Sequence, residues 1–528
     1  MLARVQGLFR NLAIYGLGDV ATSLISLLLL PVYTAYLSPE EYGIIAMLLT
    51  IEAVAKILFR WGVDTAFMRM YFDCADQGAR QRLASTIFFF LAAVNGTLLA
   101  AGVLGAEWLS VRLFDTARHA LIIALVIANT FVVGFYFIPF QVLRIREESR
   151  LFISLVFGRS AGTIVARLLL VIVAQMGVLG VVVADVLVTA VFSLVLARWY
   201  APLIRPVFSR PLLDEALAFG LPRIPHAVAN QVIGIADKYF LNAFGALRDV
   251  GLYSIGASFG LGLKLFLSAF EYAWTPFFLG AMKEPDAKEI YSKVSTYVIA
   301  VLILLVAGLC AVAPDLIRLM TEQKFHDAAV VTPWIALGVM FQGLYLVGSI
   351  GLIITRRTSR YPIATGIAAA TSVVSNVLLI PRFGLIGAAW SQTIAYGTLA
   401  LVTIAFSWRE YPIHYEWSRL LRIAIAGALA FAAASRLVPP LPPLAGLMVR
   451  GLVTVGAYTA LMFAFRFFHA GELRILREMR RRALRKKPFA MAPARDGAVE
   501  MAGDIVSTAP DPLDDVEGSS PDSRAQRR

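Results

Sequence analysis

Two lysines stand inside long apolar stretches, and each is followed by an acidic residue about two helical turns later. Lys264 and Glu271 lie in "FGLGLKLFLSAFEYAW" (259–274), and Lys56 precedes Asp64 in a second such stretch. In a helix, Lys264 and Glu271 would share one face about 10 Å apart along the axis, too far for a direct salt bridge. The chemistry that cations in an apolar segment could supply is electrostatic binding of an anionic group.

The surroundings of the two lysines differ. Glu52 stands one turn before Lys56 and Arg60 one turn after it, which predicts a ladder of i,i+4 charge pairs. A glycine and a serine occupy the matching positions around Lys264, so Lys264 is expected to be the less neutralised cation. The alternative interpretation for both lysines is an inter-helix salt bridge that only fixes packing.

The composition places these residues in a membrane. The 528 residues are 59% hydrophobic and 16% charged, with a mean hydropathy of +0.73, which is not a soluble composition. Apolar runs of about 20 residues, enough to cross a bilayer, recur along the chain. The first run contains Asp19 and no small-residue cleavage site, so an uncleaved anchor is expected. About fourteen spans are predicted, over roughly residues 11–37, 42–65, 82–105, 119–142, 150–175, 177–198, 213–243, 250–279, 291–313, 328–354, 361–380, 384–407, 418–438 and 444–467.

Lysines and arginines gather in alternate loops, and the loop over 37–43 between them has none. This bias predicts a multi-pass membrane protein with both termini in the cytoplasm. The basic segment "RILREMRRRALRKK" (474–487) is expected to lie on anionic lipids of the inner leaflet, and nucleic acid is not an expected partner. Residues 488–528 are rich in Pro, Asp, Ser and Ala and are predicted to be disordered.

The chain repeats itself. "YTAYLSPEEYGIIAMLLTI" (33–51) aligns with "LNAFGALRDVGLYSIGASF" (241–259) at a shift of 208 residues, and "GVLGVVVAD" (177–185) aligns with "GLIGAAWSQ" (384–392) at a shift of 207. The repeat length holds an even number of spans, so both copies insert with the same orientation. The expected fold is all-α, with two six-helix lobes related by a pseudo-two-fold axis along the membrane normal, as in transporters.

The repeat gives a domain organisation and relates the two lysines. The expected parts are an N-terminal lobe (1–210), a C-terminal lobe (211–412), two additional spans (413–468), a basic interfacial segment (469–487) and a disordered cytoplasmic tail (488–528). Under the same shift Lys264 falls on Lys56, and Glu271 falls within one residue of Asp64. Both lysines are expected near mid-membrane, where a lysine facing lipid would cost roughly 2.5–3.5 kcal/mol.

Several other polar residues lie in or near the spans. Arg159 and Arg167 on the fifth span could either line the lumen or snorkel, and Asp237 with Lys238 could be a structural pair or a substrate contact. His226 has no companions with metal-ligand spacing, so no metal site is predicted. Cys74 and Cys310 are far apart and imply no disulfide framework. No phosphate-binding loop of the form GxxxxGK[ST] occurs, and no cofactor is expected.

Two prolines are expected to break the seventh span. Pro222 and Pro225 lie near its cytoplasmic end, where each removes a backbone donor. We expect a bend there that could serve as a hinge or lateral gate.

Motifs in both halves resemble those of a known family. The stretch "FGLPRIPHAVANQVIGIADKYFLNAFGALRDVGLYSIG" (219–256) is similar to the seventh-helix signature of lipid-linked oligosaccharide flippases. "LPVYTAYLSPEEYG" (30–43) and "WGVDTAFMRMY" (61–71) are similar to the first-lobe counterparts. These flippases belong to the multidrug/oligosaccharidyl-lipid/polysaccharide exporter superfamily, and the resemblance covers roughly residues 8–467. The related peptidoglycan-precursor flippases have additional arginines in span one, where this chain offers only Asp19, which argues against that branch.

The resemblance implies export of undecaprenyl-pyrophosphate-linked sugar units by alternating access, with a polysaccharide polymerase as a possible partner. It maps the family's cation-lined cavity, by position, onto Lys56, Arg60, Arg69, Arg223 and Lys264. The acids Glu52, Asp64 and Glu271 would then balance charge or couple transport to an ion. No motif identifies the sugar.

Two other function classes compete with a flippase. A drug exporter of the same superfamily should favour an acidic lumen, and the basic residues at mid-membrane count against it. A membrane enzyme that polymerises or ligates glycans should have a sizeable outer loop, and no expected outer loop much exceeds about 20 residues. A transporter rather than an enzyme is therefore expected.

Overall fold

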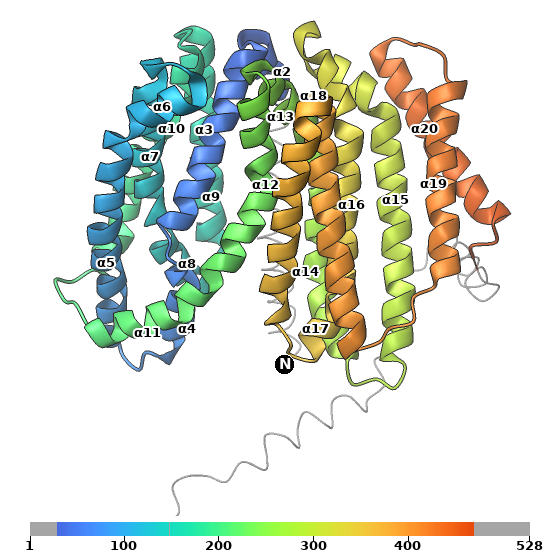
Figure 1. Cartoon of the computed structure of the whole chain (residues 1–528). Coiled ribbons are helices and arrows are strands. Elements are labelled where there is room, and N and C mark those ends of the chain that lie inside the picture. Colours follow the sequence, from blue (N-terminus) through green and yellow to red (C-terminus); the bar gives the residue numbers. More distant parts are fainter. Residues whose placement is uncertain (1–28, 147, 469–528) are drawn as a thin grey trace, which may run out of the picture. The chain divides into compact units, whose positions relative to one another are not determined.

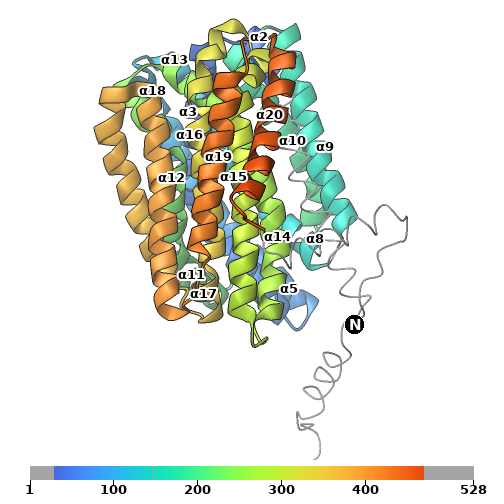
Figure 2. The same cartoon turned by 90° about the vertical axis from the view of Figure 1, so that its right-hand side faces the viewer.

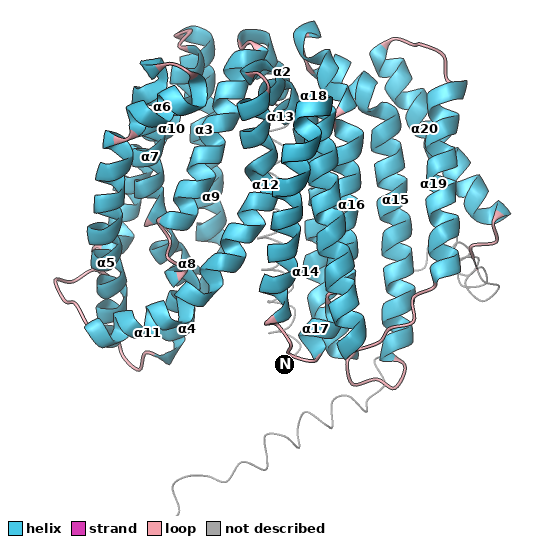
Figure 3. Cartoon of the chain, viewed as in Figure 1, coloured by secondary structure: helices cyan, strands magenta, loops and turns pink. Residues whose placement is uncertain are grey.

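The computed structural model describes residues 29–146 and 148–468, which form one compact unit as far as Phe467. Every regular element in these residues is a helix (Figures 1 and 3). Most of the first expected span, with Asp19, lies outside the described residues. The basic segment 474–487 and the tail 488–528 lie outside them as well.

The N-terminal helices follow the expected spans closely. They are α2 (Leu30–Tyr36), α3 (Pro39–Leu58), α4 (Val63–Asp73), α5 (Gln77–Leu104), α6 (Ala106–Phe114), η1 (Ala117–His119), α7 (Ala120–Gly134), α8 (Phe137–Ile145), α9 (Ser149–Leu168), the π-helical turn η2 (Leu169–Val173) and α10 (Gly177–Tyr200). The start of α3 is fixed by a capping box, in which Ser38 Oγ accepts from Glu41 N at 3.1 Å and Glu41 Oε2 accepts from Ser38 N at 2.8 Å.

The remaining helices build the second lobe and its two extra crossings. They are α11 (Arg210–Gly220), η3 (Leu221–Arg223), α12 (Ile224–Phe244), α13 (Leu247–Leu261), α14 (Lys264–Ala281), α15 (Ala287–Met320), η4 (Gln323–Val330), α16 (Thr332–Gly348), α17 (Ile350–Ile354), α18 (Arg360–Glu410), α19 (Trp417–Leu437) and α20 (Pro443–Ala464). The α18 range holds two helices joined at Gly384, whose backbone is not helical (φ 53°, ψ −125°). This confirms the predicted division of spans eleven and twelve.

The described residues contain 11 helices that are long and apolar enough to cross a membrane. Two further crossings add to these. Division of α18 at Gly384 gives one, and α12, which comprises 21 residues and follows α11, gives the other. Within residues 29–146 and 148–468 the structure therefore holds thirteen of the expected crossings, together with the end of the first one as α2. The all-α, multi-pass architecture is confirmed.

The internal repeat is visible where α3 meets α13, near the top of Figure 1. A Cβ added to Gly43 would lie 2.0 Å from the carbonyl oxygen of Leu247, and one added to Gly251 would lie 1.9 Å from that of Pro39. Gly251 and Leu247 are the residues that the 208-residue shift assigns to Gly43 and Pro39. The same contact is thus made twice, once from each repeat, and we call it the paired-glycine contact.

Both second crossings of the lobes are broken, which the sequence analysis did not predict. The chain between α3 and α4 turns at Trp61 and Gly62, both with positive φ. Buried Asn95 on α5 stabilises this break, because its Nδ2 donates to Phe59 O at 2.7 Å and its Oδ1 accepts from Trp61 Nε1 at 2.9 Å. Between α13 and α14 the break falls at Gly262 and Leu263.

Span seven bends where Pro222 and Pro225 were expected to bend it. The turn η3 separates α11 from α12, and α11 lies across the foot of the N-terminal helices in Figure 1. Buried Ala216 of α11 belongs to the same apolar cluster as Phe67 of α4 and Leu83 of α5. By contrast, α12 packs along α18. The packing partners of the chain therefore change at η3, from α4 and α5 before it to α18 after it.

The two additional crossings, α19 and α20, both pack on α15 (Figure 2). Asp315 of α15 is 1% exposed, and its Oδ2 lies 2.6 Å from Arg450 Nη1 of α20. The hydroxyl of Tyr458 on α20 donates to Ala300 O of α15 at 2.8 Å. A buried ion pair and a buried hydrogen bond thus fix α20 to the second lobe.

Candidate functional site

Lys56 and Lys264 occupy equivalent depths in their crossings. The crossings Pro39–Asp73 and Leu247–Ala281 each comprise 35 residues. Lys56 and Lys264 are the eighteenth residue of their crossings, so each lies at the midpoint. The breaks fall on opposite sides of them, since Lys56 lies in the last turn of α3 and Lys264 begins α14.

In the first lobe Lys56 and Arg60 are each paired with an acid four residues away. Lys56 Nζ lies 2.6 Å from Glu52 Oε1, and Arg60 Nη1 lies 3.6 Å from Asp64 Oδ2. The expected i,i+4 pairing of Glu52 with Lys56 is present. The second pair spans the break between α3 and α4, so Asp64 neutralises Arg60 locally. These two pairs leave the four charged residues from Glu52 to Asp64 without a net charge.

Lys264 has a different environment. Among the described residues no carboxylate lies within 4 Å of its Nζ, which instead lies 5.8 Å from the centroid of the Tyr396 ring. The Glu271 side chain is exposed and forms no ion pair in this part of the chain either. The packing salt bridge that was the alternative interpretation of Lys264 is therefore not found among the described residues.

Arg69 and Arg223, far apart in sequence, meet on one aromatic ring. The guanidinium of Arg69 on α4 lies 5.0 Å from the centroid of Phe219, and that of Arg223 in η3 lies 4.4 Å from it. Both arginine side chains are exposed. The bend of span seven produces this cluster, because it lays α11 against α4 and places Arg223 about one helical turn after Phe219. Two of the five expected cavity cations thus come together in the half of the bundle that is expected to face the cytoplasm.

Asp237 of the second lobe, which the sequence left open between a structural pair with Lys238 and a substrate contact, is a buried acid. Asp237 is 2% exposed, and its carboxylate accepts from the hydroxyl of Tyr253 and from the backbone N–H of Lys238 at 2.9 Å. The Tyr253 hydroxyl also lies 3.3 Å from Gln392 Oε1. Among the described residues no ion pair joins Asp237 to the Lys238 ammonium. Asp237 instead joins α12, α13 and α18 in one polar cluster.

His226 has a structural partner. Its Nδ1 lies 2.9 Å from Thr365 Oγ1, which links α12 to α18 beside the bend of span seven. No group of three potential metal-ligating His, Cys, Asp or Glu side chains occurs within the described part of the chain.

Repeated all-helical lobes, joined at a symmetric contact and carrying cations at the midpoints of matched crossings, define the architecture of a membrane transporter. The sequence profile of one family, described as polysaccharide biosynthesis protein, matches residues 34–330, more than half of the chain. The chain belongs to this family.

Solved structures share the fold. The lipid II flippase MurJ in an inward closed conformation superposes with a TM-score of 0.66, at 14% identity over 88% of this chain and 99% of that one. A multidrug resistance MATE family transporter of the MOP superfamily, in an inward-facing conformation, gives a TM-score of 0.58, at 15% identity over 79% of this chain and 96% of that one. At these identities the likeness establishes the fold alone.

A curated relative is an uncharacterized membrane protein of Methanocaldococcus jannaschii. It is 24% identical over 286 residues, which are 51% of this chain and 54% of that protein. The chain therefore matches about half the length of this relative.

Proposed function

We propose that this protein flips undecaprenyl-pyrophosphate-linked oligosaccharide units across the cytoplasmic membrane, for the synthesis of a surface polysaccharide such as O-antigen, exopolysaccharide or capsule. The observation that supports this most directly is Lys264, a cation at the midpoint of its crossing with no carboxylate within 4 Å among the described residues. A diphosphate headgroup crossing a low-dielectric region requires such a counter-charge. Membership of a polysaccharide biosynthesis family supports the same substrate class.

In this proposal the cations act at successive depths. Arg69 and Arg223, stacked on Phe219, receive the diphosphate from the cytoplasmic side, and Lys264 holds it at mid-membrane. The paired cations Lys56 and Arg60 contribute when Glu52 and Asp64 rotate away or bind an ion. Glu271, exposed and unpaired among the described residues, is a second candidate for ion coupling.

Access to the site is proposed to alternate between the membrane faces. The first and second repeats meet where α3 packs along α13, at the expected outer end. The continuing helices have separate partners: α4 packs against α11, α5 and α8, and α14 packs against α15 and α16. This arrangement supports an inward-facing state. The bend at Pro222 and Pro225 lies at the cytoplasmic edge of the same interface and is the proposed hinge or lateral gate.

The proposed location is the cytoplasmic membrane with both termini inside. The arginine-rich segment 474–487 would contact anionic inner-leaflet lipids, and a polysaccharide polymerase would consume the glycan on the other side.

The test is gene deletion followed by lipid extraction. We expect lipid-linked oligosaccharide to accumulate where an impermeant glycan-modifying reagent added to spheroplasts cannot reach it, and the wild-type gene to reverse this. Unchanged lipids together with hypersensitivity to cationic drugs would contradict the proposal and favour the multidrug exporter, whose fold this chain shares.

A further inference from the structure

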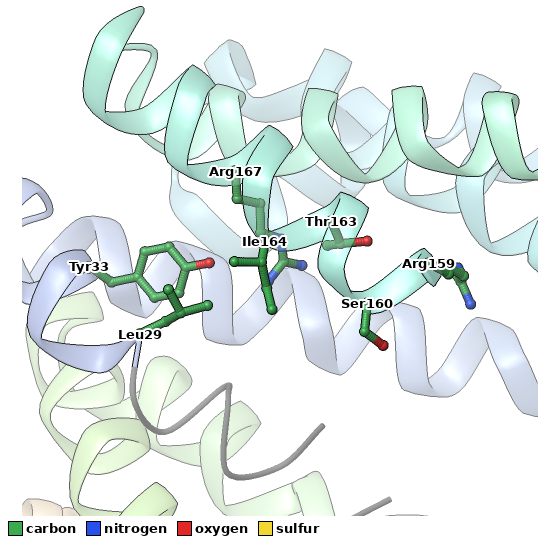
Figure 4. Close-up of a pocket in the computed structure, with 7 residues that line it drawn as sticks. All are labelled: Leu29, Tyr33, Arg159, Ser160, Thr163, Ile164 and Arg167. Atoms are coloured by element: carbon green, nitrogen blue, oxygen red, sulfur yellow. The ribbon is translucent and has the colours of Figure 1, made fainter. Parts of the chain in front are cut away.

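A pocket of about 180 Å³ lies between α2 and α9, and its lining combines the apolar side chains of Leu29 and Ile164 with five polar ones (Figure 4). Arg159 and Arg167 mark its two ends, about 12 Å apart along the helix axis. The hydroxyls of Ser160 and Thr163 lie between them, and Tyr33 of α2 faces them across the pocket. Arg159 lies near the middle of the continuous helical segment formed by α9 and η2, so its charge is far from either membrane surface.

The two arginines differ in how they are neutralised. Arg167 forms a bidentate pair with Asp185 of α10, with Nε–Oδ1 and Nη2–Oδ2 distances of 2.8 and 2.7 Å. Arg159 lies over the Tyr136 ring, 5.2 Å from its centroid, and no ion pair joins it to any described carboxylate. The charges of Arg167 and Asp185 cancel each other. The net positive charge of these three residues is therefore that of Arg159.

The hydroxyl groups of the pocket have acceptor or donor capacity to spare. Ser160 Oγ donates to Val156 O at 2.9 Å and retains its lone pairs. The Tyr33 hydroxyl oxygen is buried next to the Arg167 guanidinium, and no hydrogen bond of standard geometry joins it to a described residue. A buried hydroxyl without a partner is costly. The pocket therefore offers a cation, free hydroxyls and an aromatic ring to one small polar group.

The internal repeat shows that the fold does not require these arginines. The two repeat shifts assign Arg159 to Gly366 or Ile367, and Arg167 to Val374 or Ser375. The second lobe builds the same helix with no charge at either position. A purely architectural role for the arginines would be expected to recur in both lobes, so their presence in one lobe indicates a ligand that contacts that lobe.

The position of the pocket links it to the lobe interface. Leu30 of α2 belongs to an apolar cluster with Leu252, Ile255 and Phe259 of α13, while Tyr33 of α2 borders the pocket. One short helix thus touches the second lobe on one side and the pocket on the other. The volume is below the range of about 300–1,000 Å³ that holds a drug-sized ligand, so the pocket accommodates one part of a larger molecule.

We propose that this pocket is a binding site for a carboxylate-bearing sugar, such as a uronate, within the transported glycan. Arg159 binds the carboxylate, Ser160, Thr163 and Tyr33 bind ring hydroxyls, and Asp185 positions Arg167. This inference rests on the proposed function and deepens it, because it assigns an acidic glycan to a flippase whose sugar the sequence leaves open.

The test uses a cysteine reporter in the pocket of the purified full-length protein. Thr163→Cys is made together with Cys74→Ser and Cys310→Ala, which removes both native cysteines. An anionic and a cationic methanethiosulfonate reagent are then compared. We expect the ratio of anionic to cationic labelling rates to fall on the order of tenfold or more when Arg159→Gln is added. The matched control, Arg382→Gln on α18, removes an exposed arginine elsewhere and should leave the ratio unchanged.

Ligand protection identifies the anion. D-glucuronate should slow labelling at 163, D-glucose should not, and Arg159→Gln should abolish the protection while Arg159→Lys retains part of it. Protection by inorganic pyrophosphate alone would overturn the sugar assignment and give the pocket to the lipid headgroup. No labelling by either reagent, or an unchanged rate ratio in Arg159→Gln, would overturn the anion site itself. None of these readouts depends on transport, so their failure is distinct from failure of the gene-deletion test.

Discussion

Lys264 is the residue on which the electrostatic proposal depends most. Lys264→Ala should reduce glycan export by more than about tenfold while protein abundance stays near normal, because no carboxylate among the described residues loses a partner. Lys264→Arg should retain part of the activity, since the charge survives while its geometry changes. Lys264→Glu should be the most damaging, because it sets an anion against the headgroup. Export and abundance are measured side by side.

The comparison that decides the role of Lys264 is the double variant with Glu271→Ala. If Lys264 only compensates an acid, removal of both charges should restore export. That outcome would assign Lys264 and Glu271 a structural role. Lys56→Ala is the matched variant at the equivalent depth. It should act partly through stability, because it leaves Glu52 without its partner 2.6 Å away.

At the residue scale, pairs within one helix were predictable and pairs between helices were not. The spacing of Glu52 and Lys56 is itself the geometric reason for their contact. The pairing of Arg167 with Asp185 joins residues 18 positions apart on two helices, and the contact of Asp237 with Tyr253 crosses a loop. Spacing carries no information on which faces of two helices meet, so these partners required the three-dimensional structure.

At the scale of elements, the paired-glycine contact is expected to control closure of the outer face. Gly43→Ala or Gly251→Ala would place a methyl group about 2 Å from a backbone carbonyl oxygen, which cannot move aside as a side chain would. Either change should separate α3 from α13 and lower export severalfold. The contrast is Gly308→Ala on α15, where nothing lies within 4 Å, and where the change should be neutral or stabilise the helix by up to about 1 kcal/mol. Equal export by the Gly43 and Gly308 variants would contradict this role.

The buried pair of Asp315 and Arg450 is expected to hold α20 in place. Arg450→Met leaves the Asp315 carboxylate, 1% exposed, without its counter-charge, and should lower the free energy of unfolding by about 3–5 kcal/mol. Thermal unfolding in detergent measures the effect. Addition of Asp315→Leu should recover most of the loss, because a pair of apolar side chains can replace a buried ion pair. A double variant as unstable as the single one would show that the pair is not the main attachment.

The features that the sequence did not predict are the two helix breaks and the direction of the bend, which depend on local backbone geometry. Hydropathy over about 20 residues averages across a break, so the separations of α3 from α4 and of α13 from α14 left no signal in it. Gly62 and Gly262 were visible in the sequence, but glycine also occurs in unbroken membrane helices. The bend of span seven was predictable because proline removes a backbone donor whatever its surroundings. That α11 packs on the N-terminal helices follows from the direction of the bend, which the prolines do not specify.

For the whole molecule, orientation in the membrane can be tested with two exposed positions. Glu322 lies between α15 and η4 on the expected outer face, and Glu284 lies between α14 and α15 on the expected inner face. In a background of Cys74→Ser and Cys310→Ala, an impermeant maleimide should label Glu322→Cys in intact cells and Glu284→Cys only after permeabilisation. The reverse pattern would place the lysine-rich and arginine-rich loops outside and contradict the proposed direction of export.

The number of crossings and the duplication were the parts of the fold that the sequence predicted best. Each follows from a property that needs no partner: apolar length for a crossing, and a nearly constant shift for the repeat. Gly177 and Gly384, aligned from the sequence, have φ values of 54° and 53°, so the repeat extends to single backbone angles. Most of the first crossing and the segment beyond Phe468 lie outside the described residues, and the predictions for them stay predictions.

The paired-glycine contact has the form of an isologous interface, as between the subunits of a symmetric dimer, although one chain supplies both sides. Gly43 contacts Leu247, which is the equivalent of Pro39 in the second repeat, and Gly251 contacts Pro39 itself. Since the two contacts are the same contact related by a rotation, one cannot lengthen while the other keeps its geometry. Opening of this face should therefore behave as a single concerted step in which both lobes turn by similar amounts, and neither lobe serves as a stationary base for the other.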